Sequence, residues 1–134
     1  MSAARATTNK DLVVGLGATG LSIARYLRRT DIDAMFFDSR ETPPGMKELD
    51  DVWPDAEVLL GDVKLPSGVA RIITSPGIAD SHPLLKKARS MHVEVVSDIE
   101  LFAREAKAPF IAVTGSNGKS TVTTLLYYMC LADG

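Results

Sequence analysis

Short apolar runs alternate with amphipathic segments along most of this 134-residue chain, and this alternation restricts its fold more than any other feature. Runs such as residues 12–15 and 34–37 lack polar alternation, which is typical of strands in a sheet covered on both faces. Residues 21–29 instead carry apolar side chains at helical spacing. The order of these segments predicts an α/β fold with a Rossmann-like, doubly wound, mostly parallel sheet.

The individual elements follow from apolar periodicity and from turn and capping residues. Ser81 can cap a helix that has Pro83 in its first turn, and residues 97–100 match a capping box. The expected strands are residues 12–15, 34–37, 57–60, 71–74, 93–96 and 109–114. The expected helices are residues 21–29, 46–49, 81 to about 90, 97 to about 106, and one that begins at 118.

Composition and charge exclude several functional classes. The formal net charge of −2 gives no broad electrostatic footprint for nucleic acid. No apolar run is long enough to cross a bilayer, and residues 1–10 lack the apolar core of a signal peptide, so we expect a cytoplasmic protein that begins with a mobile arm. The single cysteine, Cys130, excludes an internal disulfide and any multi-cysteine metal site.

The first glycine loop, from Gly15 to Gly20, matches the G-x-G-x-x-G pattern between a predicted strand and a predicted helix. Gly15 permits a tight turn, Gly17 lets a diphosphate approach the backbone, and Gly20 lets helix pack on strand. The helix N-terminus then faces the anion, and Thr19 could add a hydroxyl donor. Asp38 ends the next strand and could bind a ribose or the edge of a base. The alternative is a glycine turn needed only for packing.

The second glycine loop follows the run 109–114 and reads Gly-Ser-Asn-Gly-Lys-Ser, which is shorter than the usual P-loop. Its glycines allow backbone N–H groups to converge on phosphate oxygens. Lys119 brings a cation to the terminal phosphates, Ser120 can ligate Mg²⁺, and Thr121 can donate to a phosphate. The alternative is a glycine turn with a surface lysine.

Several stretches together resemble the Mur ligases of peptidoglycan synthesis. They are GLGATGLS, FDSRETPPG, TSPGI and the segment from Ser97 to Thr124, and they cover nearly the whole chain after residue 10. The GSNGKST form of the second loop fits the D-glutamate-adding members better than other members or folylpolyglutamate synthetase. The resemblance implies a three-domain enzyme whose first domain is Rossmann-like, whose second is a P-loop ATPase domain and whose third is again Rossmann-like.

The resemblance also implies a reaction. ATP and Mg²⁺ would activate the carboxylate of UDP-N-acetylmuramoyl-L-alanine as an acyl phosphate, and the amine of D-glutamate would attack it to give an amide, ADP and phosphate. Residues 11–107 would bind the UDP part of this substrate, and residues 108–134 would open the ATPase domain. With only that opening present, we expect the isolated chain to lack ligase activity.

Site residues carry over by position. The predicted UDP-binding residues are Gly17, Ala18, Thr19, Asp38, Ser39, Arg40, Ser75, Pro76 and Gly77. The predicted ATP-binding residues are Gly115, Ser116, Asn117, Gly118, Lys119, Ser120 and Thr121, with Lys119 as the catalytic residue and Ser120 as the Mg²⁺ ligand.

Two rival functions stay open at this point. One is an NAD-binding domain of an oxidoreductase or sensor, which would use Asp38 but leaves the second loop unexplained. The other is a non-catalytic module with no affinity for nucleotides. The last helix carries an apolar stripe of Val122, Leu125, Leu126 and Met129. This stripe predicts that the helix docks elsewhere, self-associates or stays partly disordered. His82 and His92 have no metal-ligand spacing, and His82 is expected on the surface at a helix start.

Overall fold

The computed structural model describes residues 9–62 and 64–133. The chain forms two compact units that divide between Arg104 and Glu105. Of the predicted mobile arm 1–10, residues 1–8 lie outside the described residues. Lys10 already belongs to the first strand, so the arm was predicted too long.

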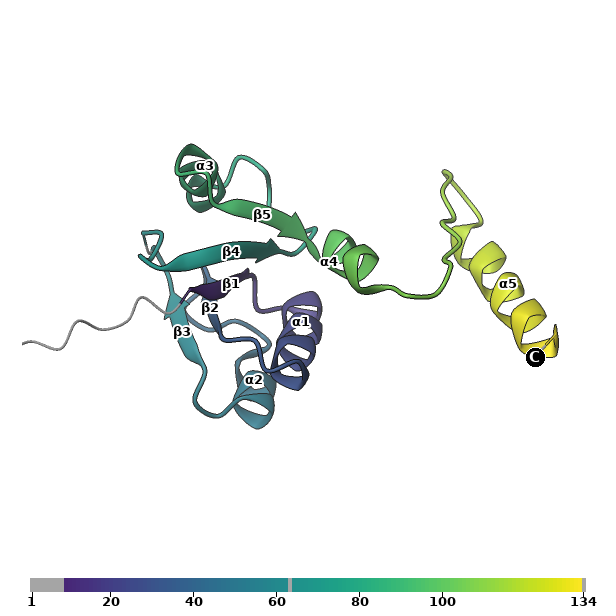
Figure 1. Ribbon diagram of the computed structural model, residues 1–134, viewed down its shortest axis with the longest axis horizontal. Coiled ribbons are helices and arrows are strands. Elements are labelled where there is room, and N and C mark those ends of the chain that lie inside the picture. Colours follow the sequence, from purple (N-terminus) through teal and green to yellow (C-terminus); the bar gives the residue numbers. More distant parts are fainter. Residues whose placement is uncertain (1–8, 63, 134) are drawn as a thin grey trace, which may run out of the picture. The chain divides into compact units, whose positions relative to one another are not determined.

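The first unit contains a five-stranded sheet whose strands are all parallel, which confirms the predicted class of fold (Figure 1). Its strand order is β3-β2-β1-β4-β5. After β1, the chain adds β2 and β3 on one side of β1, and then β4 and β5 on the other side. The strands are β1 Lys10–Val14, β2 Ala34–Asp38, β3 Glu57–Leu60, β4 Val69–Thr74 and β5 Glu94–Ser97.

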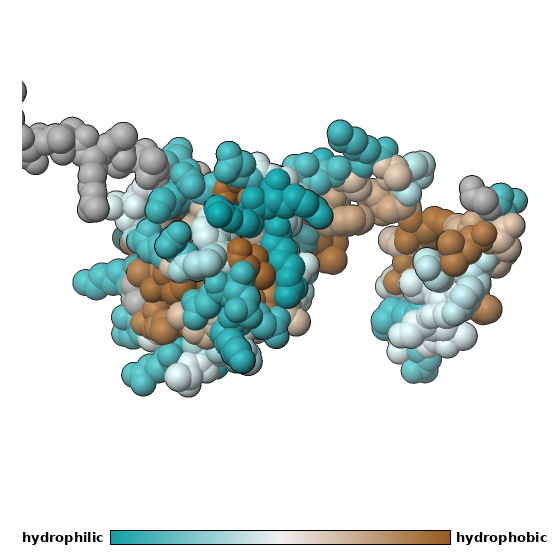
Figure 2. All heavy atoms as spheres, turned by 90° about the horizontal axis from the view of Figure 1, so that it is seen from below, coloured by the Kyte–Doolittle hydropathy of each residue, from teal (hydrophilic) through white to brown (hydrophobic). Residues whose placement is uncertain are grey.

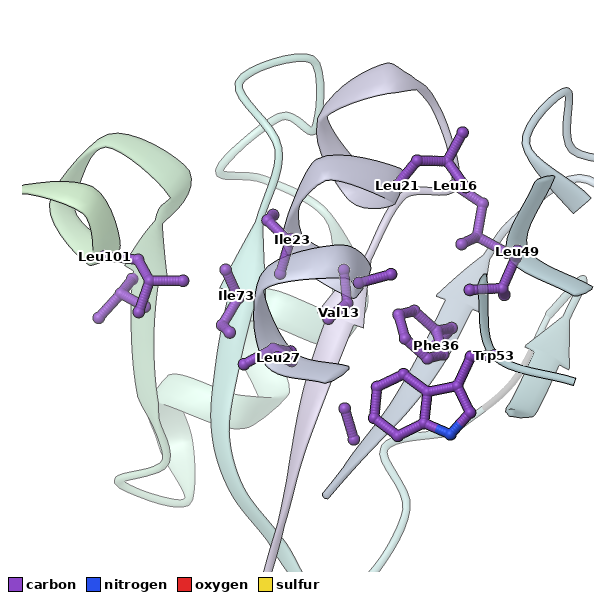
Figure 3. Packing of buried hydrophobic residues seen from close by; sticks show 13 residues of the cluster. Val13, Leu16, Leu21, Ile23, Leu27, Phe36, Leu49, Trp53, Ile73 and Leu101 are labelled. Atoms are coloured by element: carbon purple, nitrogen blue, oxygen red, sulfur yellow. The ribbon is translucent and has the colours of Figure 1, made fainter. Parts of the chain in front are cut away.

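Helices cover both faces of this sheet. One face packs against α1 and α2 through a cluster that includes Val13, Phe36 and Ile73 (Figure 3). The other face packs against α3 through a cluster that includes Leu12 and Phe37. The helices that precede the second unit are α1 Ala18–Arg29, α2 Met46–Val52, α3 Pro83–Ser90 and α4 Asp98–Glu105, and the boundary between the units falls at the last residue of α4.

Strand register aligns the ends of the central strands. Val14 pairs with Phe37 of β2 on one side and with Thr74 of β4 on the other. Asp38 is the last residue of β2, and the residues that follow β1 and β4, Gly15 and Ser75, leave the sheet along the same edge. The strand order reverses direction at β1, which lies between β2 and β4. This edge therefore contains the topological switch point, where ligands of such sheets bind.

Trp53 is a packing residue of the core. Its ring lies edge-on to Phe36 (Figure 3), with the ring centroids 5.6 Å apart. The Arg28 guanidinium lies 5.3 Å from the indole centroid. Trp53 thus packs within the core cluster on the face of the sheet that α1 covers.

Helix boundaries differ from the prediction at two informative places. Helix α1 begins at Ala18 rather than residue 21, because the second half of the glycine loop forms its first turn. Helix α3 is capped by His82 and not by Ser81: the His82 Nδ1 accepts a hydrogen bond from the Leu84 N–H at 3.3 Å. One half of the predicted capping box of α4 is confirmed, since the Ser97 hydroxyl accepts from the Glu100 N–H at 3.0 Å. The Glu100 carboxylate accepts from Arg104 Nη2 at 2.6 Å.

The second unit contains α5, Lys119–Asp133, preceded by an extended segment. The strand predicted at 109–114 is wrong: these residues form no strand. An apolar run becomes a strand only when a neighbour pairs with its backbone, and no described strand pairs with this one. No side chain of α5 is buried, and Figure 2 shows hydrophobic residues on the surface of this unit.

Candidate functional site

A pocket of about 400 Å³ lies at the carboxyl edge of the sheet, where β1, β2 and β4 end. Three loops that are distant in sequence line it. It brings together all the predicted UDP-binding residues except Pro76, which is not among the lining residues: Gly17, Ala18, Thr19, Asp38, Ser39, Arg40, Ser75 and Gly77.

The glycine loop forms one wall of the pocket. Gly15 has a φ of 99°, a left-handed conformation that glycine adopts without strain. A Cβ on Gly20 would lie 1.9 Å from the carbonyl oxygen of Gly15, so only glycine fits where α1 packs on the loop. A Cβ on Gly17 would meet nothing within 4 Å, so the backbone at the mouth of the loop is open.

Helix α1 presents its N-terminus to the pocket. Gly17 is its N-cap and supplies no side-chain cap, and no acidic residue lies in the first turn. Its first N–H groups and its partial positive charge are therefore available to an anion. Ala18 and Thr19, both pocket-lining, occupy this first turn.

Asp38 forms the centre of the second wall and is only 3% exposed. Its carboxylate accepts hydrogen bonds from the N–H of Leu16 at 2.8 Å and from the N–H of Arg40 at 2.9 Å. It also accepts from Arg40 Nε at 2.8 Å and from Nη2 at 2.7 Å. Both oxygens are thus engaged within the protein, and the carboxylate fastens the loop after β2 to the glycine loop.

This hydrogen bonding makes the Asp38 carboxyl more acidic than an ordinary aspartate. The side-chain hydrogen bond from Arg40 lowers the pKa of Asp38 from 3.8 to about 2. Burial opposes this effect, and the two backbone N–H groups reinforce it. The pairing in turn raises the pKa of Arg40. Near neutral pH the site therefore holds a charged pair whose net charge is zero.

Ser75 supplies an unusual group on the β4 side. Its hydroxyl oxygen is buried and has no hydrogen-bond partner among the described residues. It lies 3.4 Å from the position of a Cβ on Gly15, so it faces the turn of the glycine loop. A buried hydroxyl without a partner costs free energy. Such a group at a pocket wall is suited to bind a polar ligand atom.

Sequence reasoning missed His82 as a pocket residue. The structure places it in the pocket lining, half-buried, with its ring edge-on to Phe37 at a centroid separation of 5.8 Å. The expected surface position was therefore wrong. The sequence signal was its place ahead of Pro83, which marks a helix start at the edge where ligands bind, but the contact with Phe37 depends on the tertiary fold.

The second glycine loop lies wholly in the second unit. Gly115 and Gly118 have φ values of 148° and 75°, which fit a loop that turns its backbone sharply. Lys119 opens α5, and its ammonium lies 2.5 Å from the Gly115 carbonyl oxygen, folded over the loop. Residues 115–121 are all exposed. Their N–H groups, the Lys119 cation and the Ser120 hydroxyl form a donor set that fits a phosphate group with its Mg²⁺.

Within the described parts of the chain, no group of three or more His, Cys, Asp or Glu residues could hold a metal ion. None of the described helices combines the length and the apolar character needed to span a membrane. Cys130 is a free, exposed thiol on α5.

Comparisons with known proteins identify relatives of this pocket-bearing unit. Residues 9–97 match the family model described as "Mur ligase MurD-like, N-terminal domain". The UDP-N-acetylmuramoylalanine–D-glutamate ligase of Legionella pneumophila (strain Paris) is 48% identical over 125 residues, which cover 92% of this chain and 28% of that protein. The protein of the same name from Shewanella violacea is 47% identical over 131 residues, which cover 94% and 29%. This chain thus spans less than a third of the length of these relatives.

Proposed function

The chain belongs to the family of Mur ligase MurD-like N-terminal domains, and from this premise we propose that its pocket binds the UDP part of UDP-N-acetylmuramoyl-L-alanine. The whole protein would be a cytoplasmic ligase that adds D-glutamate to this substrate in peptidoglycan synthesis. The relatives carry that activity in their names. The division of the chain into a UDP-binding domain and the start of an ATPase domain is part of the same proposal.

One observation supports this proposal most strongly. Residues carried over from the family by position, from three separate loops, line one pocket at the switch point of the sheet. Thr19, Arg40 and Ser75 are far apart in the sequence and follow three different strands, so their meeting in one pocket depends on the fold. A pocket of about 400 Å³ is within the size range of small-molecule sites.

The pocket offers different chemistry to the parts of a nucleoside diphosphate. The N-terminus of α1, with Ala18 and Thr19, supplies neutral donors for the diphosphate. Ser39 and Arg40 would frame the uracil, with Asp38 holding Arg40 in place. Ser75 and Gly77 would contact the ligand from the β4 side. The buried hydroxyl of Ser75, which has no partner among the described residues, would then form a hydrogen bond with the ligand.

In the whole enzyme, the second loop would serve ATP. The N–H groups of residues 115–118 would cradle the phosphates, and Lys119 would stabilise the charge that develops as the terminal phosphate moves to the substrate carboxylate. Ser120 would be a Mg²⁺ ligand, and the ion would neutralise phosphate charge when bound. The D-glutamate amine would then displace phosphate from the acyl phosphate, forming the amide and releasing a proton.

The 134-residue chain by itself would lack this activity. The stabilising charges of an acyl-transfer site must converge on one reaction centre. Among the described residues, Lys119 is the only cation in the second loop, and residues 115–121 are exposed to solvent. We expect no ATP consumption that depends on D-glutamate; its detection with the purified chain would contradict this part of the proposal. The exposed apolar residues of α5 would favour self-association of the isolated chain.

The rival NAD-binding function is less well supported. A dehydrogenase of this fold uses a carboxylate after β2 to accept hydrogen bonds from the ribose hydroxyls. Here both oxygens of Asp38 already accept hydrogen bonds from Leu16 and Arg40. A ribose would have to displace Arg40 to reach them.

Calorimetric titration tests the proposed function directly. The chain is titrated with UDP-N-acetylmuramoyl-L-alanine, and separately with NAD and with Mg-ATP. We expect binding of the UDP ligand and weak or no binding of NAD. Thr19→Val removes one pocket hydroxyl without changing side-chain volume and should weaken the UDP ligand several-fold, whereas Thr42→Val, exposed and outside the lining, should not. Tighter binding of NAD than of the UDP ligand would overturn the assignment.

A further inference from the structure

We propose that His82 is a ligand-binding residue of this pocket, and that its Nε2–H donates a hydrogen bond to a phosphate oxygen of the nucleotide. This inference rests on the proposed function, because it assigns a further contact to the same ligand. It concerns a residue that neither glycine loop contains.

The helix cap fixes the tautomer of His82. Its Nδ1 accepts a hydrogen bond from the N–H of Leu84 at 3.3 Å, where α3 begins. A neutral imidazole with Nδ1 as acceptor carries its proton on Nε2. Among the described residues, Nε2 has no hydrogen-bond partner. The ring therefore presents one unused N–H donor.

Packing then restricts where this donor can lie. The imidazole is edge-on to Phe37, with an interplanar angle of 70°, and Phe37 is itself only 3% exposed. One side of the ring thus packs against a buried core residue. The cap holds Nδ1 at the start of α3, and the residue lines the pocket. Since α3 covers the face of the sheet opposite to α1, His82 approaches a ligand from the side opposite the glycine loop.

The Nε2–H donor of His82 matters because the pocket offers an anionic ligand little unpaired positive charge. Arg40 is the only lysine or arginine among the described lining residues, and its guanidinium is paired with Asp38 at 2.8 and 2.7 Å. A diphosphate therefore meets little uncompensated positive charge here. Neutral donors must supply most of its hydrogen bonds, and the imidazole N–H joins the α1 N-terminus and the Ser75 hydroxyl in that set.

Two substitutions separate capping from ligand binding. His82→Asn keeps a side-chain acceptor that is favoured at helix N-caps but is too short to replace the Nε2 donor. His82→Ala removes both. The 134-residue chain and both variants are titrated with UDP and with uridine, and their melting temperatures are compared.

We expect His82→Asn to melt close to the wild type and to bind UDP about tenfold more weakly, as for loss of a hydrogen bond to a charged group. His82→Ala should lose the same affinity and also melt lower. Uridine has no phosphate, so its affinity should be the same for the three proteins. Long-range ¹H–¹⁵N spectra of the imidazole should show the Nε2-protonated tautomer, with the Nε2 resonance shifting when UDP is added.

Three results would overturn the inference while leaving the proposed function standing. They are UDP binding by His82→Asn within twofold of the wild type, an equal loss of uridine and UDP affinity, and an Nδ1-protonated ring. Failure of the wild-type chain to bind either UDP or the full UDP substrate would overturn the proposed function first, and this inference with it.

Discussion

The carboxylate of Asp38 accepts a hydrogen bond from the backbone N–H of Leu16 at 2.8 Å, although the two residues are 22 positions apart. The same carboxylate holds both the backbone and the guanidinium of Arg40. Asp38 therefore joins two walls of the pocket, and the geometry of the glycine loop depends on a residue in the next strand.

Replacing Asp38 with asparagine should weaken both stability and binding. The amide has one acceptor oxygen and no charge, so it cannot hold Leu16 and Arg40 together. We expect the free energy of unfolding to fall by about 1–3 kcal/mol and the affinity for UDP to fall with it. Urea denaturation and calorimetry measure the two effects. Asp55→Asn, an exposed loop position, is the matched control; an equal, small effect at both positions would contradict the linking role of Asp38.

The stabilising effect of Asp38 should depend on pH in a defined window. Its pKa is lowered in the folded state from 3.8 to about 2, so the folded protein binds this proton less readily than the unfolded chain. The contribution is therefore fully present above pH 3.8 and is lost as the pH falls from there to about 2. Because Arg40 is half exposed, we expect roughly 1–2 kcal/mol. The difference in unfolding free energy between wild type and Asp38→Asn, measured from pH 6 to pH 2, should shrink accordingly. A difference that stays constant would show that Asp38 does not act through its charge.

Two glycines of the same loop should respond in opposite ways to alanine. Gly20→Ala places a methyl group 1.9 Å from the Gly15 carbonyl oxygen, so we expect a severely destabilised or unfolded protein. Gly17→Ala meets no atom within 4 Å and has an ordinary φ of −101°, so its melting temperature should stay near that of the wild type. If the diphosphate packs on this backbone, Gly17→Ala should still bind UDP more weakly. Equal stability of the two variants would show that the loop relaxes around Gly20.

Ser75→Ala should separate stability from binding. The Ser75 hydroxyl is buried with no described partner, so its removal should leave the unfolding free energy unchanged or raise it by up to about 1 kcal/mol. The same change removes a proposed ligand donor, so UDP affinity should fall several-fold. Thermal melting with and without UDP checks both effects in one experiment. A clear loss of stability in the ligand-free variant would mean that the hydroxyl already has a partner in solution.

Much of the fold was predictable because local pattern and tertiary structure agree there. The apolar strands β1, β2 and β3 and the glycine turn between β1 and α1 need only periodicity and glycine chemistry to be recognised. The run 109–114 has an equally apolar pattern but no described strand beside it, and a backbone ladder requires two partners. The apolar pattern of a segment does not show whether another strand is available to pair with its backbone.

The candidate site was predictable in its membership and less so in its chemistry. The family resemblance indicated that Gly17, Asp38 and Ser75 belong to one site, and the structure brings all three into one pocket. The resemblance did not show that Asp38 is already saturated with hydrogen bonds, because Leu16 and Arg40 converge on it only in the folded chain. His82 was missed for the same reason: its partner Phe37 is 45 positions away and on another strand.

A Cβ has space at Gly17 but not at Gly20, so natural variation at these two positions distinguishes the requirements of folding from those of ligand binding. At Gly20 the fold itself forbids any side chain, so an unvarying glycine there would carry no information about what the protein binds. At Gly17 the fold would accept alanine, and selection for folding alone would let the position drift. Glycine kept at this position through long divergence would therefore record pressure from a ligand, and a lineage that has lost the ligand should lose Gly17 while it keeps Gly20.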